Sequence, residues 1–224
     1  MATNRSNALP PQWGNLIENL NATDDNCGNP FFQQAISRLE SLWKERVTNQ
    51  NDKASGVLLS ALGQALTVYS TTESVTKAFV HLLPEVLRVS QSPFGFLAEV
   101  RYSAPNKPYL YSHAVTDIYK PGFGLYDIVT DLQFHNLDTL NGAIMTGRRP
   151  VLTNDPPNDP RSGGLPFGHT GLEAYLGLPF LVDDDLVGAT SLGDRSGGYS
   201  EREVELLAPL CEIGGLIIAT HRNR

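Results

Sequence analysis

Three histidines are the residues whose type most readily suggests chemistry in this chain, because imidazole binds metals and transfers protons. His113, His135 and His169, with Asp138 or Asp155, would supply the ligands of a zinc site. Their spacing does not support one, because they come from separate parts of the chain and include no His-x-x-x-His or Cys-x-x-Cys pair. We therefore expect no metal and no cofactor, and interpret the histidines as hydrogen-bonding pocket residues or as ordinary core and surface residues.

The segment 154–161, with the sequence NDPPNDPR, brings Asp155, Asp159 and Arg161 onto one proline-rich loop. Charges of both signs would suit an anion or a metal. Asp and Asn side chains also accept hydrogen bonds from nearby backbone N–H groups, and proline fixes φ, so such a loop needs these residues to hold its shape. We favour this structural interpretation, although ordered loops often carry function.

The cysteines and the charge balance exclude several classes of protein. The two cysteines are Cys27, in a polar segment, and Cys211, inside an apolar helical pattern, which suits a reducing compartment. The first residues, MATNRSNALPP, have no apolar core of the kind that signal peptides carry, and no apolar run approaches the ~20 residues of a membrane span. A net charge of −7 without a basic stripe disfavours nucleic acid. We expect a cytoplasmic protein that binds neither membrane nor nucleic acid.

The elements that would position these residues follow a flexible N-terminal arm, residues 1–30. One short amphipathic helix in this arm, which would dock on the domain or on a partner, is indicated by Trp13, Leu16, Ile17 and Leu20. Residues 31–54 are predicted to form a helix over 31–47 and a linker, with an apolar stripe of Phe32, Ile36, Leu39, Trp43 and Val47. This stripe requires cover, either from its own domain or from a second copy in a homodimer.

Two further helices are predicted before the strands, and one after them. The first has an apolar face of Leu58, Leu62, Ala65 and Tyr69. The next begins at Ser70, where Ser-x-x-Glu with Glu73 forms a capping box, and Pro84 should kink it. The last begins at Ser200 with a capping box to Glu203, and Pro209 should bend it.

From Phe94 the apolar period changes to two, which is typical of strands. Alternation over 94–101 and 109–115 predicts a hairpin. Residues 116–172, with a helical island near 137–146, are too long for an idle loop. Two more strands are predicted at about 174–182 and 186–192, around the acidic turn 183–185. This order predicts an α/β (α+β) fold whose antiparallel sheet carries helices on one face.

Residues 134–199 contain a series of ordered blocks, namely FHNLDTLNGAIMTGRRPVLTNDPPNDPRSGGLPFGH, LEAYLGLPF and LVGATSLGDRSGGYS. Together they resemble the GAF domain, and more narrowly the bacterial signalling type found alone or ahead of output domains such as histidine kinases and diguanylate cyclases. The resemblance covers about residues 55–220. It implies a central antiparallel sheet with helices behind it and a ligand pocket in front, roofed by residues 116–172.

We predict that seven residues bind the ligand in this pocket. Strand alternation places three of them on one side of the hairpin, the resemblance adds a tyrosine from the third strand, and the roof contributes the other three. The predicted ligand-binding residues are Phe96, Tyr111, His113, His135, Thr139, His169 and Tyr175.

Three specialised GAF branches offer alternatives. Free methionine sulfoxide reductases use cysteines around the pocket, and this chain has none between Cys27 and Cys211. Bilin-binding GAF domains generally anchor their pigment through a cysteine near the roofing helix or in an N-terminal arm, and Cys27 leaves only the second route. Cyclic-nucleotide-binding GAF domains carry an Asn-Lys, Phe, Asp-Glu signature. A degenerate counterpart is found here in Asp194-Arg195, Tyr199 and Arg202-Glu203.

The departures from that last signature favour a structural role for its residues. Asp replaces Asn and Arg replaces Lys. We interpret Arg195 and Glu203 as an ion pair that ties the exit of the last strand to the final helix, and cyclic-nucleotide binding as an alternative only.

We therefore expect a signal-sensing module that binds an unknown small molecule in the pocket and passes the signal to a separate signalling protein. The sequence ends soon after the final helix, so we expect the output to lie on another polypeptide. The alternative is a dimerisation or interaction module whose pocket is filled by its own side chains, and an enzyme is the least favoured interpretation. Self-association through helices, as a homodimer, is also expected.

Overall fold

The computed structural model describes residues 29–224 apart from 50–51, 120–121, 123–126 and 166. The short helix predicted around Trp13 to Leu20, and Cys27, lie outside the described residues. The described helices are α3 (Pro30–Leu42), a π-helical turn (Trp43–Asn49), α4 (Lys53–Thr72), α5 (Val75–Ser90), α6 (Leu140–Gly147) and α7 (Glu201–Arg222). A 3-10 turn follows α6, at Pro156–Asn158.

The strands form one antiparallel sheet in the order β3-β2-β1-β7-β6-β5, with β4 beside β2. They are β1 (Phe94–Ala104), β2 (Lys107–Thr116), β3 (Ile128–Val129), β4 (Gln133–Phe134), β5 (Val151–Thr153), β6 (Tyr175–Val182) and β7 (Asp185–Gly193). The predicted hairpin and the two later strands are therefore confirmed. Asp183 and Asp184 both have positive φ, which is the turn chemistry that a two-residue hairpin between β6 and β7 requires.

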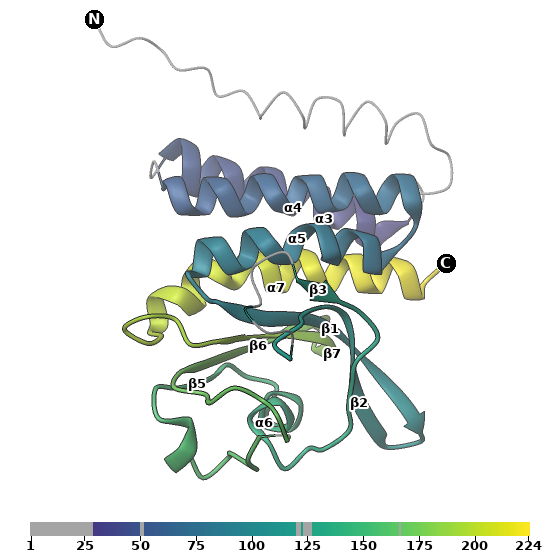
Figure 1. The fold of residues 1–224 in the computed structure, drawn as a ribbon. Helices are drawn as coiled ribbons and strands as arrows, with labels where there is room; N and C mark the ends of the chain where they lie inside the picture. Colours follow the sequence, from purple (N-terminus) through teal and green to yellow (C-terminus); the bar gives the residue numbers. More distant parts are fainter. Residues whose placement is uncertain (1–28, 50–51, 120–121, 123–126, 166) are drawn as a thin grey trace, which may run out of the picture.

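The molecule is layered, as Figure 1 shows: α3 and α4 lie over α5 and α7, these two cover one face of the sheet, and α6 lies on the other. The larger core fills the helical side, where Phe79, Phe180 and Ile217 are fully buried. α7 is the one described helix with the length and hydropathy of a membrane span, and 61% of that stretch is buried within the fold. The α+β sheet with helices on one face is the predicted fold.

The apolar stripe of the first helix is covered by its own chain. Phe32 and Leu39 are at most 1% exposed and belong to the core that α3 shares with α7, while Trp43 is half-buried against it. Asn29 caps this helix by accepting from the backbone N–H groups of Phe31 and Phe32, and its Nδ2 donates to the carbonyl of Thr220 at the end of α7. Most of this stripe is therefore covered within the chain, while Ile36, Trp43 and Val47 stay partly exposed.

The capping box predicted at Ser70 and Glu73 is wrong. α4 continues through Ser70, whose Oγ donates to the carbonyl of Thr67, and Glu73 ends that helix with a φ of 55°. Ser74 instead caps α5 by accepting from the N–H of Lys77. The longer apolar pattern of α4 outweighs the local Ser-x-x-Glu signal, because buried contacts decide where a helix ends more strongly than one cap does.

The capping box predicted at the start of the last helix is confirmed. The carboxylate of Glu203 accepts from both the backbone N–H and the hydroxyl of Ser200, each at 2.8 Å. The predicted ion pair is present as well, with 3.6 Å between Arg195 Nη2 and Glu203 Oε1. Arg195 and Glu203 therefore hold the exit of β7 against α7, as the structural interpretation of this signature predicts, whereas Asp194 Oδ1 accepts from the N–H groups of Glu173 and Ala174 at the start of β6.

Candidate functional site

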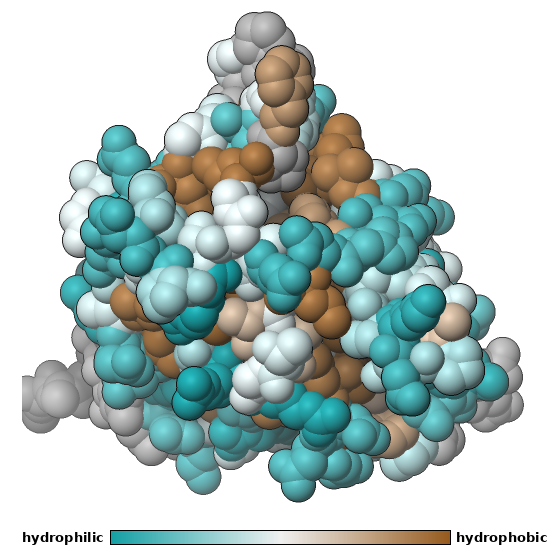
Figure 2. Space-filling view, turned by 90° about the horizontal axis from the view of Figure 1, so that it is seen from below, coloured by the Kyte–Doolittle hydropathy of each residue, from teal (hydrophilic) through white to brown (hydrophobic). Residues whose placement is uncertain are grey.

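A cavity of about 800 Å³ opens on the face of the sheet that the helical layers leave uncovered. Its floor is the inner face of β1, β2, β6 and β7, and its walls come from the segments between β2 and β6. Figure 2 looks at the molecule from this side, where hydrophobic residues lie exposed among hydrophilic ones. The sequence predicts a roofed pocket in front of the sheet, and residues 116–172 supply most of its walls.

Aromatic rings form much of the lining. Phe96 is stacked on Phe134, with 4.9 Å between the ring centroids and 21° between the planes. His169 meets the rings of Phe94 and Tyr119 edge to face, at 6.1 and 6.5 Å. A Cβ at Gly193 would lie 2.1 Å from the ring of Phe94, so the absence of a side chain there allows this ring to lie over β7. The cavity thus offers flat apolar surfaces for a ligand to stack against.

A polar corner interrupts the apolar lining where α6 begins. The hydroxyl of Tyr175 lies 2.7 Å from Asn141 Oδ1 and 2.8 Å from Ser191 Oγ, and Ser191 Oγ donates to the same Oδ1 at 2.8 Å. Burial raises the pKa of Tyr175, so its hydroxyl stays protonated and serves as a donor. Thr139 caps α6 by accepting from the N–H of Gly142, which fixes the direction of Asn141 at the start of that helix.

The described lining carries little charge. It includes one carboxylate, Asp117, and two imidazoles, His135 and His169, and among its described residues no lysine or arginine. Arg161 lies next to the lining residue Ser162, but its guanidinium is paired with Asp159 and with the carbonyl of Leu152. The described lining therefore carries a single formal charge, that of Asp117, if both imidazoles are neutral.

The loop that holds Arg161 is stabilised by its own polar side chains. Asn158 Nδ2 donates to both carboxylate oxygens of Asp155 at 3.0 Å, and Arg161 donates to Asp159. The guanidinium beside Asp159 lowers the pKa of that carboxyl. These contacts support the structural interpretation of residues 154–161.

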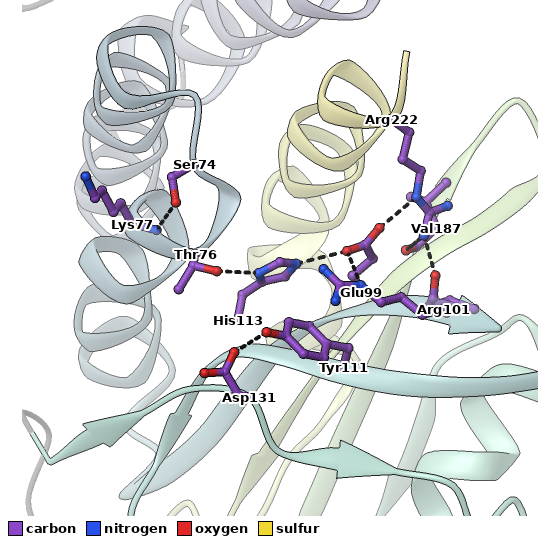
Figure 3. Close-up of polar contacts among 11 residues, drawn as sticks. Ser74, Thr76, Lys77, Glu99, Arg101, Tyr111, His113, Asp131, Val187 and Arg222 are labelled. Atoms are coloured by element: carbon purple, nitrogen blue, oxygen red, sulfur yellow. Dashed lines mark hydrogen bonds and ion pairs between the residues drawn. The ribbon is translucent and has the colours of Figure 1, made fainter. Parts of the chain in front are cut away.

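Five of the seven predicted ligand-binding residues lie in the cavity lining, and two do not. Those brought together are Phe96, His135, Thr139, His169 and Tyr175. The assignment of Tyr111 and His113 to this face is wrong, because both side chains lie on the helical face of the sheet (Figure 3).

A β-bulge is the physical reason. Leu97 pairs with Ala114 while Ala98 pairs with Ser112, so β2 contains one extra residue, His113, at this point. An extra residue inverts the inward and outward alternation beyond it. Val115 therefore faces the cavity beside Phe96. Tyr111, four residues earlier in β2 and on the other side of the bulge, faces the helices instead.

On the helical face, His113 belongs to a buried polar cluster around Glu99 (Figure 3). Its Nδ1 lies 2.8 Å from Thr76 Oγ1 and its Nε2 lies 3.1 Å from Glu99 Oε2. Arg101 Nε and Arg222 Nε donate to the same carboxylate at 3.0 and 2.8 Å. Burial by itself would raise the pKa of Glu99, but the hydrogen bonds from His113 and Arg222 outweigh it and lower the pKa to about 2.

This cluster reaches the cavity wall through Tyr111. The guanidinium of Arg101 lies 3.6 Å from the centre of the Tyr111 ring, and the Tyr111 hydroxyl donates to Asp131. Asp131 and the lining residue Leu132 are in turn bonded to Ser112, through Asp131 N to Ser112 O at 2.9 Å and Leu132 N to Ser112 Oγ at 3.0 Å.

Several of these residues were missed by reasoning from the sequence. Asn141 and Ser191 lie in blocks that carry the resemblance, where a polar residue between apolar neighbours is the only available signal. Glu99 gives a clearer signal, because a carboxylate inside the apolar stretch Phe94–Val100 has to find cations. Over the residues that the structure describes, no three His, Cys, Asp or Glu side chains gather as metal ligands, and His113 lies across the sheet from His135 and His169.

Solved structures share this architecture. The GAF domain of a phosphoenolpyruvate-protein phosphotransferase from Coxiella burnetii matches with a TM-score of 0.59 and 16% identity, over 75% of this chain and 96% of that one. A free methionine-R-sulfoxide reductase from Neisseria meningitidis matches with a TM-score of 0.54 and 10% identity, over 77% and 94%. The phycocyanobilin-bound GAF domain of a cyanobacterial phytochrome matches with a TM-score of 0.51 and 12% identity, over 75% and 97%.

An antiparallel sheet with helices on one face and a walled cavity on the other defines the class of α/β domains to which these structures belong. The family model of the GAF domain matches residues 72–219. The chain belongs to the GAF domain family, which is a family of sensory and signalling modules.

Proposed function

We propose that this protein is a cytoplasmic signal-sensing module that binds a small molecule in the cavity over the sheet and passes the signal to a separate partner protein. The observation that supports this function most directly is the cavity itself, since its described walls leave about 800 Å³ unfilled. Ligand sites in proteins typically measure about 300–1,000 Å³ and combine apolar walls with a few polar groups. An interaction module whose pocket is filled by its own side chains would leave no such opening.

The polar cluster on the other face of the sheet offers a route from the ligand to the partner. Leu132 lines the cavity, and its N–H donates to Ser112 on β2. The preceding residue of β2, Tyr111, contacts Arg101 through its ring. Arg101 donates to Glu99, which also accepts from Arg222 in the last turn of α7. A ligand that displaces the wall would disturb this chain of contacts. The partner would read a change at the exposed end of α7.

A thiol enzyme is a poor alternative for the described part of the chain. Cys211 lies on α7, within the helical layers and not in the cavity lining. Burial raises the pKa of its thiol to about 12, so the nucleophilic thiolate does not form near neutral pH.

The test combines native mass spectrometry of the purified protein with a thermal-shift screen of metabolites. We expect a bound small molecule, or a compound that raises the melting temperature. Leu172→Trp, which adds volume to the lining, should abolish the shift, and Leu181→Trp, on an exposed position of β6, should preserve it. The proposal fails if no compound binds, and the interaction module would then replace it.

A further inference from the structure

We infer that the ligand is an uncharged, flat, largely apolar molecule that carries one hydrogen-bonding group at its buried end. This inference rests on the proposed function and deepens it, because it assigns a chemical class to what the cavity binds. Three features of the described lining support it: its charge, its aromatic surfaces and its polar corner.

The charge of the lining disfavours an anionic ligand. A phosphate or carboxylate that leaves water needs a cation or several hydrogen-bond donors to compensate for its lost hydration. The described lining has neither lysine nor arginine, and the guanidinium of Arg161, beside it, is already engaged by Asp159. For a cationic ligand the described lining offers a single carboxylate, Asp117, which keeps its charge although its Oδ1 accepts from the N–H of Tyr119, so a cationic probe is part of the test.

The rings of the lining favour a flat apolar ligand. Phe96 and Phe134 are stacked along one wall, and Phe94 and His169 meet at another. The mouth is also apolar and exposed, which leaves surface for a ligand to cover. Its partly exposed hydrophobic lining residues are Tyr119, Val129, Leu132 and Leu165. Because covering apolar surface stabilises a complex in proportion to the area removed from water, an apolar ligand would gain most here.

The polar corner specifies a hydrogen-bonding group. Asn141 Oδ1 accepts from Tyr175 and Ser191, while within the described chain no hydrogen bond engages its Nδ2. This N–H donor suits a carbonyl or ring-nitrogen acceptor. His169 adds the opposite capacity, because its Nδ1 lies 2.6 Å from the carbonyl of Thr170 and so must carry the hydrogen, which leaves Nε2 of the neutral ring as an acceptor.

The test compares three probes of nearly equal shape, namely 2-naphthamide, 2-naphthoate and 2-naphthamidine, against the full chain by calorimetry and by NMR. We expect 2-naphthamide to bind at least about tenfold more tightly than either charged analogue, because a charged group would lose its hydration in the cavity without full compensation. Equal or tighter binding of 2-naphthoate or 2-naphthamidine would overturn the inference. So would the failure of all three to bind at millimolar concentration.

A charge-reversing variant locates the effect in the cavity. Leu172→Lys places a cation in the lining and should turn the preference toward 2-naphthoate, whereas Leu181→Lys, on the exposed surface of β6, should leave it unchanged. Asn141→Leu should weaken 2-naphthamide alone. A small molecule that co-purifies and carries a net charge would contradict this ligand class and still uphold the proposed function, so the two failures are distinguishable.

Discussion

The carboxylate of Glu99 is the centre of the buried polar chemistry on the helical face. It is 6% exposed and is bonded to Arg101, His113 and Arg222. Glu99→Gln keeps the shape of this side chain and removes its charge. Because the cations would then face a neutral amide that has one acceptor oxygen in place of two, we expect a loss of about 1–3 kcal/mol in the free energy of unfolding, measured by urea denaturation.

Glu212→Gln is the matched control, since Glu212 pairs with Arg38 in a half-exposed position on the same helical layers. Pairs of this kind contribute about 0–1 kcal/mol. Equal losses in the two variants would show that the buried carboxylate of Glu99 contributes no more to the free energy of unfolding than the half-exposed carboxylate of Glu212.

The same carboxylate predicts a pH dependence. Its pKa falls from 4.5 to about 2 in the folded chain, so the unfolded state takes up the proton first as pH falls. The stabilisation from Glu99 is therefore complete above about pH 4.5 and is lost progressively toward pH 2. In urea titrations over this range, Glu99→Gln should lose less stability than the parent protein. Parallel curves would contradict this assignment.

At the scale of elements, the start of α7 depends on two contacts of unequal strength. Glu203 both closes the capping box with Ser200 and pairs with Arg195. Glu203→Ala should therefore cost about 1–2 kcal/mol, as other lost caps do, and Arg195→Ala about 0–1 kcal/mol. Thermal unfolding measures both, and binding of 2-naphthamide should survive in each. A larger loss from Arg195→Ala would reverse this order.

The packing of the cavity floor depends on Gly193. A Cβ there would collide with the ring of Phe94, so we expect Gly193→Ala to destabilise the fold by about 1–3 kcal/mol and to shift Phe94 into the cavity. Gly171→Ala is the control, because Gly171 also lines the cavity and a Cβ there meets no atom within 4 Å. Chemical denaturation of the pair, with calorimetry of 2-naphthamide, tests both expectations.

The element scale also shows where prediction from the sequence succeeds and fails. The strands, the final helix and the placement of five residues in the cavity lining follow from periodicity and from resemblance to a known family, because these signals extend over many residues. The bulge at His113 depends on how β2 pairs with β1, which alternation along one strand cannot reveal. The boundary between α4 and α5 likewise depends on tertiary packing, and the local Ser70 signal is misleading.

At the scale of the whole molecule, self-association stays a prediction. The stripe that first suggested it is largely covered by α7, and Trp43 is left half-buried at its end. If a dimer forms through the first helix, light scattering should report twice the chain mass, and Trp43→Ser should weaken the association. A monomer at high protein concentration would contradict the prediction of self-association.

The last prediction concerns transmission across the sheet. The cavity wall at Leu132 and the end of α7 at Arg222 lie on opposite faces and are joined through Tyr111, Arg101 and Glu99. If this chain of contacts carries the signal, binding of 2-naphthamide should change hydrogen exchange at residues 216–222, because exchange reports local opening. Tyr111→Phe removes the hydroxyl that reaches Asp131 and keeps the ring under Arg101.

In that variant the ligand should still bind, while its effect on exchange at the end of α7 should fall well below that in the parent protein. Tyr102→Phe is the control, because Tyr102 is 63% exposed on the neighbouring strand β1 and is not among the partners of Glu99. An undiminished effect in Tyr111→Phe would show that the side chains of the cluster do not carry the coupling. The direct packing of α7 on β6 and β7, which also form the cavity floor, would then be the physical connection to test next.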